Sequence, residues 1–122
     1  MATIERFEDM AVWEESRAFA DTVYQVTANG RFAKDFALRD QIRKAAVSIP
    51  SNIAEGFERD RRGEFIQFLR YAKGSAGEVR SQLYHARDLD YIDKDTFEDL
   101  RTEAISLSRQ IQGFIKYLES TR

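Results

Sequence analysis

The sequence predicts an all-α protein, with one domain over residues 1–122 folded as an antiparallel up-down-up-down four-helix bundle. Three observations support this fold class. Apolar residues recur at alternating steps of three and four, which is the spacing of one face of a helix. The chain contains one proline and six glycines, which are few helix breakers for 122 residues. The segments between the periodic stretches are short, and short connections make successive helices antiparallel neighbours.

The first helix is predicted from an apolar face that begins at Val12 and ends at Val26. Asn29 and Gly30 are expected to end this helix, because glycine readily adopts the left-handed conformation found at helix C-termini. The connections between helices are then expected near residues 29–35, 57–63 and 88–93.

The second helix is predicted from an apolar face that runs from Leu38 to Ile53, and it is expected to end near Gly56. Pro50 lies within it, and a proline removes one backbone hydrogen bond and pushes against the carbonyl four residues earlier. Either the helix ends near Ser48 and restarts, or it continues with a kink. The sequence favours the kink, because the apolar face keeps its phase through Pro50.

The third and fourth helices have the most regular patterns. The third is predicted from seven apolar positions: Phe65, Leu69, Ala72, Ala76, Val79, Leu83 and Ala86. The fourth is expected at about residues 94–120, from Phe97, Leu100, Ala104, Leu107, Ile111, Phe114 and Leu118. Its first turn can be capped by Asp93, Asp95 or Thr96, since each has a side-chain oxygen that accepts hydrogen bonds from backbone N–H groups.

Composition excludes several classes of function. The chain has no cysteine, which excludes disulfides and thiolate metal sites, and its one histidine, His85, excludes multi-histidine sites. A di-iron bundle needs Glu-x-x-His pairs, whereas Gln82 stands three residues before His85. Since no nucleotide-binding or nucleophile motif is present either, we expect no enzyme activity, no cofactor, no metal and no small-molecule substrate. A cytoplasmic protein without a membrane span is expected, because the sequence has neither a signal-peptide pattern nor a long apolar run.

The net charge of −2 conceals an uneven distribution. Residues 1–30 carry a net charge of −4, residues 31–87 carry +5 and residues 88–122 carry −3. A basic middle segment is compatible with binding to phosphates. The alternative is that the acidic ends neutralise the middle segment across helix interfaces.

Basic residues of the middle segment are the candidates for nucleic-acid binding. Lys73, Arg80 and Arg87 stand at seven-residue steps and so share one face of the third helix. Arginine and lysine bind phosphates well. The alternative is a solvated face that pairs with acids such as Glu55 and Glu64. The candidates are Arg39, Arg43, Lys44, Arg59, Arg61, Arg62, Arg70 and Lys73.

A second set of residues is the candidate for a subunit interface. The stretch SIPSNIAEG at residues 48–56 places four polar side chains on one helix face: Ser48, Ser51, Asn52 and Glu55. This face either binds a partner or is exposed to solvent, with its side chains satisfying backbone carbonyls that the bend at Pro50 leaves free. Gly74 and Gly77 interrupt the third helix, at a cost of about 1 kcal/mol each relative to alanine. That cost indicates close approach of another backbone, from within the bundle or from a neighbouring subunit.

Three segments of the chain resemble one known family. They are FEDMAVWEESRAFADTVY at the start, LRDQIRKAAVSIPSNIAEGFER at residues 38–59 and EFIQFLRYAKGSAGEVRSQL at residues 64–83. Over about residues 7–118, their order and spacing resemble the small four-helix-bundle proteins first found encoded within intervening sequences of bacterial 23S ribosomal RNA genes.

The resemblance implies an antiparallel four-helix bundle that forms a homopentameric ring and has no assigned catalytic site. The family is similar to the accessory variability determinant of diversity-generating retroelements, which associates with a reverse transcriptase and nucleic acid through a basic surface. That relative is strongly basic, whereas this chain has a pI of about 5.5. We therefore expect a non-enzymatic, oligomeric scaffold or adaptor that binds RNA or a nucleic-acid-handling protein through the basic candidates. The alternative is a protein–protein interaction module that binds no nucleic acid.

Overall fold

The structure is a computed structural model and describes residues 4–121. These residues form a 3-10 turn at Phe7–Asp9 and five α-helices: α1 (Ala11–Val26), α2 (Gly30–Lys34), α3 (Phe36–Glu58), α4 (Arg62–Asp88) and α5 (Lys94–Ser120). No strand occurs in this part of the chain, so the predicted all-α class is confirmed. No helix within residues 4–121 is long and apolar enough to cross a membrane.

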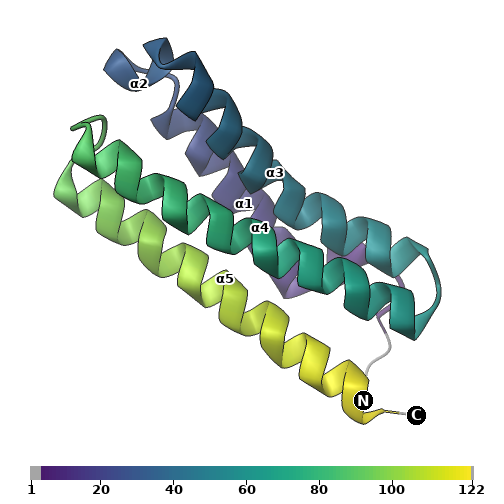
Figure 1. The fold of residues 1–122 in the computed structure, drawn as a ribbon. Helices are drawn as coiled ribbons and strands as arrows, with labels where there is room; N and C mark the ends of the chain where they lie inside the picture. The colour runs from purple at the N-terminus through teal and green to yellow at the C-terminus, as the bar shows by residue number, and fades with distance from the viewer. Residues whose placement is uncertain (1–3, 122) are drawn as a thin grey trace.

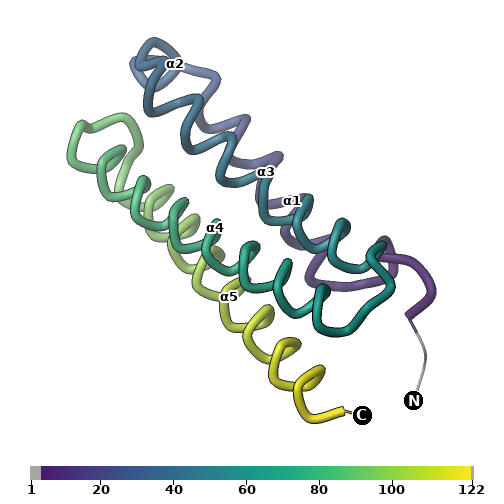
Figure 2. Tube along the Cα trace, turned by 45° about the vertical axis from the view of Figure 1, so that its right-hand side comes forward, coloured from purple at the N-terminus to yellow at the C-terminus, as the bar shows by residue number. Residues whose placement is uncertain are grey.

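Four of the five helices are long and lie side by side (Figure 1, Figure 2). α4 packs against α3 and α5, and α1 packs against α3 and α5 on the other side of the core. The apolar faces predicted from the sequence turn inward and share one core. All four long helices supply fully buried side chains to it, among them Phe19, Ile49, Leu83 and Leu107.

α3 continues through Pro50 without a break. The alternative in which this helix ends near Ser48 and restarts is therefore wrong. The Ser48 hydroxyl forms a 2.6 Å hydrogen bond with the Ser75 hydroxyl on α4, and Asn52 Nδ2 donates to the Ser48 carbonyl at 2.8 Å. Polar groups beside the proline thus join α3 to α4.

α3 comes very close to α4 at Gly56. α3 ends at Glu58, two residues after the glycine near which its end was predicted, and Gly56 is buried within the helix. A Cβ atom placed on Gly56 would lie 2.6 Å from the Cβ atom of Phe68 and 3.0 Å from the Phe65 ring. The absence of a side chain at position 56 therefore lets the two helices approach.

The connection expected at residues 29–35 contains a helix of five residues, α2, which the sequence analysis missed. Gly30 has a positive φ of 61°, but it begins α2 instead of ending α1. α1 already ends at Val26, and the Thr27 hydroxyl donates to the Val23 carbonyl at 2.8 Å. The Thr27 side chain thus adds a second hydrogen bond to the Val23 carbonyl, which also accepts from the Thr27 amide at 3.0 Å.

α2 packs against the turn between α4 and α5. The buried Phe32 ring lies 5.3 Å from the Tyr91 ring, measured between ring centres. Arg31 Nη2 donates to the Leu89 carbonyl at 3.0 Å, and the Tyr91 hydroxyl donates to Asp35 Oδ2 at 2.9 Å. These contacts join α2 and the connection after it to the turn between α4 and α5, at one end of the molecule.

α5 spans Lys94–Ser120, so the helix predicted at about 94–120 is confirmed. Of the three candidate caps, Asp93 holds the N-cap position and its carboxylate accepts from the Thr96 amide at 2.7 Å. Asp95 and Thr96 lie inside the helix.

Asp35 is expected to control part of the stability at acid pH. Its carboxylate accepts from the Leu38 amide at 3.1 Å and from the Tyr91 hydroxyl, and these hydrogen bonds lower the pKa of Asp35. A carboxyl group with a lowered folded-state pKa stabilises the fold above its unfolded pKa of about 3.9, and this contribution is lost as the pH falls through the folded-state pKa.

We expect Asp35→Ala to lower stability at about pH 7 and to flatten the loss of stability between about pH 5 and pH 2. Urea unfolding at a series of pH values measures both effects. Asp95→Ala, which removes an exposed carboxylate from the first turn of α5, is the control. An acid-side profile of Asp35→Ala that matches the unsubstituted protein would contradict this role.

Candidate functional site

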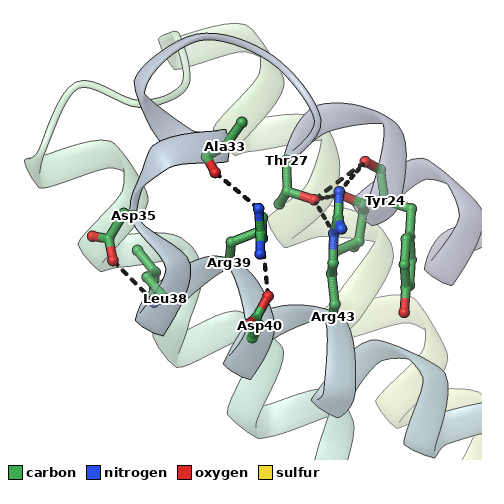
Figure 3. A network of polar contacts seen from close by, with 9 residues as sticks. Tyr24, Thr27, Ala33, Asp35, Leu38, Arg39, Asp40 and Arg43 are labelled. Carbon is green, nitrogen blue, oxygen red and sulfur yellow. Dashed lines mark hydrogen bonds and ion pairs between the residues drawn. The ribbon is translucent and has the colours of Figure 1, made fainter.

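Two of the basic candidates, Arg39 and Arg43, bind to other parts of the chain where α1, α2 and α3 meet (Figure 3). Arg43 Nε donates to Thr27 Oγ1 at 2.7 Å, and Arg43 Nη2 donates to the Tyr24 carbonyl at 3.2 Å. Arg39 Nη1 donates to the Ala33 carbonyl at 3.0 Å. Both guanidinium groups thus fasten the end of α1 and α2 to α3, which gives them a structural role.

Lys44 lies apart from the other basic candidates. It is exposed on α3 and lines a hollow of about 270 Å³ between α3 and α4, together with Gln41, Ser48 and Glu78. The hollow therefore contains one cation and one carboxylate, which gives it no strong preference for anions.

The polar face of SIPSNIAEG divides into two parts. Ser48 and Asn52 are half-buried. The Ser48 hydroxyl joins α3 to α4 through Ser75, and Asn52 donates to that hydroxyl within α3. Ser51 and Glu55 are exposed, and Glu55 pairs with Arg59 on the same helix end at 2.8 Å. Only the second pair is free to face another molecule, so a subunit contact through this face stays a prediction for Ser51 and Glu55.

The arginines of the turn between α3 and α4 differ in how many groups of the chain contact their guanidinium groups. Arg59 pairs with Glu55 and Glu64, at 2.8 Å and 3.4 Å, and its guanidinium lies 4.9 Å from the centre of the Phe68 ring. The Arg61 side chain is 81% exposed and stands 3.6 Å from a Glu64 oxygen. Arg61 is therefore a weakly held cation at the surface, whereas Arg59 is held by three groups.

Basic side chains of α4 follow the boundary with α5. We call this set the basic seam: Arg62, Arg70, Lys73, Arg80 and Arg87. Contacts of three members with α5, or with the residue that follows it, show that the seam lies beside α5. Arg62 Nη1 donates to the Thr121 carbonyl, and Arg70 forms a 2.8 Å ion pair with Glu119. The Arg87 guanidinium lies 4.6 Å from the centre of the Phe97 ring. Twenty-five positions of helix separate the first and last members, so the seam is about 38 Å long.

The middle of the basic seam opens into a groove of about 400 Å³. Its walls come from α4 and α5, and the residues that line it are Arg70, Lys73, Gly74, Gly77, Arg80, Ser108 and Gln112. Within residues 4–121, neither Lys73 nor Arg80 has a carboxylate oxygen within ion-pair distance. The groove thus combines two unpaired cations with a hydroxyl and an amide group.

Comparison with known proteins places the chain in a family. Residues 8–113 match the 23S rRNA-intervening sequence protein family. The chain belongs to this family. The structure is similar to the crystal structure of a protein of unknown function from the S23 ribosomal protein family of Bacteroides thetaiotaomicron, with 26% sequence identity and a TM-score of 0.80. That match covers 87% of this chain and 99% of the other. A search of curated proteins found no match.

In this member of the family, the two predicted sites are not separate. Arg70 and Lys73 were expected to bind nucleic acid, and Gly74 and Gly77 were expected at a subunit interface, yet all four line the same groove. A Cβ atom on either glycine would have no neighbour within 4 Å. Close approach of another helix of the same bundle is therefore the wrong explanation for these glycines. The explanation by a neighbouring subunit stays a prediction.

Two groove residues, Ser108 and Gln112, were not found from the sequence. Both stand directly after core positions of α5, Leu107 and Ile111, and both are half-buried. Periodicity places them at the edge of the apolar face, but it gives no sign of which α4 side chains they meet.

No metal centre accompanies the groove. Among residues 4–121, no group of three or more histidine, aspartate or glutamate side chains is arranged to hold a metal ion. His85 is exposed on α4.

Proposed function

We propose that the protein is a non-enzymatic, oligomeric scaffold or adaptor that binds RNA through the basic seam. The observation that carries the proposal is the arrangement of Arg62, Arg70, Lys73, Arg80 and Arg87 along one boundary. Among the described residues, three of them have no carboxylate partner: Arg62, Lys73 and Arg80. A line of cations about 38 Å long matches an extended polyanion, because the phosphate backbone supplies most of the affinity of nucleic-acid complexes.

The distribution of charge supports a local binding site on an acidic protein. The net charge is −2, so long-range attraction to RNA is weak, and binding has to come from cations held close together. Within residues 4–121, Arg70 is the one seam member that forms an ion pair with the acidic C-terminal segment across a helix boundary, through Glu119. Since both side chains are about half exposed, this ion pair is weak enough for a phosphate to replace.

The name of the family supports binding to RNA, and it refers to no chemical reaction. Its name refers to 23S rRNA, and the similar crystal structure comes from a family called ribosomal, with unknown function. In the proposal, the chain is a single domain in the cytoplasm. Its four long helices run up-down-up-down with a bend at Pro50, and its copies assemble into the homopentameric ring that the family resemblance implies.

The proposal predicts that arginines near the start of the seam contribute to binding. We expect Arg61→Ala combined with Arg62→Ala to weaken binding of a fluorescein-labelled oligouridylate. The slope of log affinity against log salt is expected to fall by about one for each phosphate that the variant no longer binds. Fluorescence anisotropy at several salt concentrations measures both quantities.

Two further variants show which arginines cause the expected loss of affinity for oligouridylate. Arg59→Ala is expected to have a smaller effect, because Glu55 and Glu64 already hold that guanidinium. Arg17→Ala on α1, whose guanidinium pairs with Glu14, is expected to leave binding unchanged. Equal affinity and equal salt dependence in the Arg61/Arg62 variant and the unsubstituted protein would place the site elsewhere.

A protein–protein interaction module is the second candidate function, and exposed apolar side chains favour it. Phe36 is 64% exposed and Tyr71 is 50% exposed, and Val47 is also exposed on α3. Salt distinguishes the two functions, because phosphate-driven binding weakens steeply as salt rises, whereas an apolar interface responds little.

A further inference from the structure

We propose that the groove between α4 and α5 holds backbone phosphates of the bound RNA, with Lys73 and Arg80 as the main ligands and Gly74 and Gly77 as the floor. This inference rests on the proposed function. It adds the site within the seam, the chemical group that is recognised and a reason for the two glycines.

The unpaired cations are the first argument. Most arginines of the middle segment have a carboxylate within 4 Å, as Arg39 has Asp40, Arg59 has Glu55 and Arg70 has Glu119. Lys73 and Arg80 have none among the residues that the structure describes. Two like charges that line one groove repel each other, and an anion between them removes that repulsion.

The opposite wall of the groove supplies neutral donors. Ser108 has a hydroxyl group and Gln112 has an amide NH₂ group, and both donate hydrogen bonds to phosphate oxygens. Cations on α4 and neutral donors on α5 therefore face the same space. Phosphate contacts in nucleic-acid complexes come from this mixture of arginine, lysine, serine and glutamine side chains.

The length of the groove favours a polymer over a free phosphate ion. Arg70 and Arg80 both line it and stand ten positions apart on α4, which is about 15 Å along the helix axis. A single phosphate ion would contact both cations only if the two long side chains bent toward each other along the helix. Consecutive phosphates of one RNA strand can contact Arg70, Lys73 and Arg80 in turn.

Gly74 and Gly77 provide the fourth argument. Each lowers helix stability relative to alanine, and a Cβ atom built on either would have no atom of another part of the described chain within 4 Å. Both lie between the cations on the groove lining. Alanine at these positions would place two methyl groups where the phosphates have to pass between Lys73 and Arg80. The glycines thus keep the floor open for the ligand.

The test uses Gly74→Ala combined with Gly77→Ala, with Gly113→Ala as the matched control. Gly113 is an exposed glycine inside α5 that also has nothing within 4 Å of a built Cβ atom. All three substitutions are expected to raise the urea midpoint, because alanine is the better helix former. Only the Gly74/Gly77 variant is expected to bind oligouridylate more weakly, by about fivefold or more at about 50 mM salt. Weaker binding by a more stable protein cannot result from unfolding.

Lys73→Ala combined with Arg80→Ala tests the charges. We expect its affinity for oligouridylate to fall by about tenfold or more at about 50 mM salt, and its salt slope to fall by about two. Millimolar inorganic phosphate is expected to leave the oligouridylate complex of the unsubstituted protein largely intact. Displacement of the RNA by phosphate at equal ionic strength would show a site for the free ion and would overturn the inference.

The remaining outcomes separate this inference from the proposed function. If the protein binds oligouridylate with strong salt dependence but both groove variants bind normally, the function stands and the groove is not the site. If the Gly74/Gly77 variant loses solution mass and keeps its affinity for RNA, the groove is a subunit contact and the inference is wrong. If the unsubstituted protein does not bind oligouridylate at any salt concentration, both fail.

Discussion

Gly56→Ala is expected to lower the free energy of unfolding by about 3 kcal/mol. The new Cβ atom would lie 2.6 Å from the Cβ atom of Phe68, a distance that real Cβ atoms do not show. The Phe68 Cβ atom is fixed to the α4 backbone and cannot rotate away. α3 and α4 would therefore have to separate, although they form the most extensive helix pair in the structure.

Urea unfolding followed by circular dichroism measures the effect of Gly56→Ala, and Gly113→Ala controls for helix propensity. Gly113 has open space around it, so Gly113→Ala is expected to raise stability by about 1 kcal/mol. Opposite signs for the same chemical change would identify Gly56 as a packing position. A Gly56→Ala protein as stable as the Gly113→Ala protein would show that α3 and α4 are not this close.

Phe97→Ala is expected to lower the free energy of unfolding by about 4 kcal/mol. The Phe97 side chain is buried near the start of α5 and lies 5.0 Å from the Tyr84 ring in an edge-to-face arrangement. The Arg87 guanidinium stands 4.6 Å from its ring centre. The substitution leaves a large cavity between α4 and α5 and removes the aromatic surface under one end of the basic seam.

The matched control for Phe97→Ala is Phe36→Ala, since Phe36 is 64% exposed at the start of α3. Its loss is expected to change stability by about 0.5 kcal/mol or less. Equal unfolding free energies for the two variants would contradict the packing of α5 on α4 described above.

The long helices were predictable because their buried apolar residues recur at a regular spacing of three or four residues. The positions predicted from the spacing are all buried between Leu69 and Ala86 and between Phe97 and Ile111. Each of these predictions needs only local spacing, and the helices are long enough for the period to repeat many times.

The end of the molecule around α2 was not predictable in this way. α2 has five residues, which is too short for a period to repeat. The groups that hold it come from distant parts of the sequence, such as Arg43 on Thr27 and Arg31 on the Leu89 carbonyl. For the same reason, no pattern in the sequence indicated that Arg39 and Arg43, predicted to bind nucleic acid, also donate hydrogen bonds within the chain.

The candidate site was predictable in part. The seven-residue steps of Lys73, Arg80 and Arg87 correctly place these cations on one side of α4. Spacing does not show which glycine is packed. The tight packing of Gly56 against α4 was not predicted, whereas Gly74 and Gly77 were expected to touch another helix of the bundle or a neighbouring subunit. Whether a glycine is packed depends on the distance between two helix axes, and the spacing of residues in the sequence does not give that distance.

The most direct test of the proposed function is the solution mass of the protein by light scattering, alone and with oligouridylate, at about 50 mM and about 200 mM salt. We expect an oligomer several times heavier than the 14.2 kDa chain, with added RNA mass at the lower salt that is lost at the higher salt. A monomer, or an oligomer that gains no mass from RNA at either salt concentration, would contradict it.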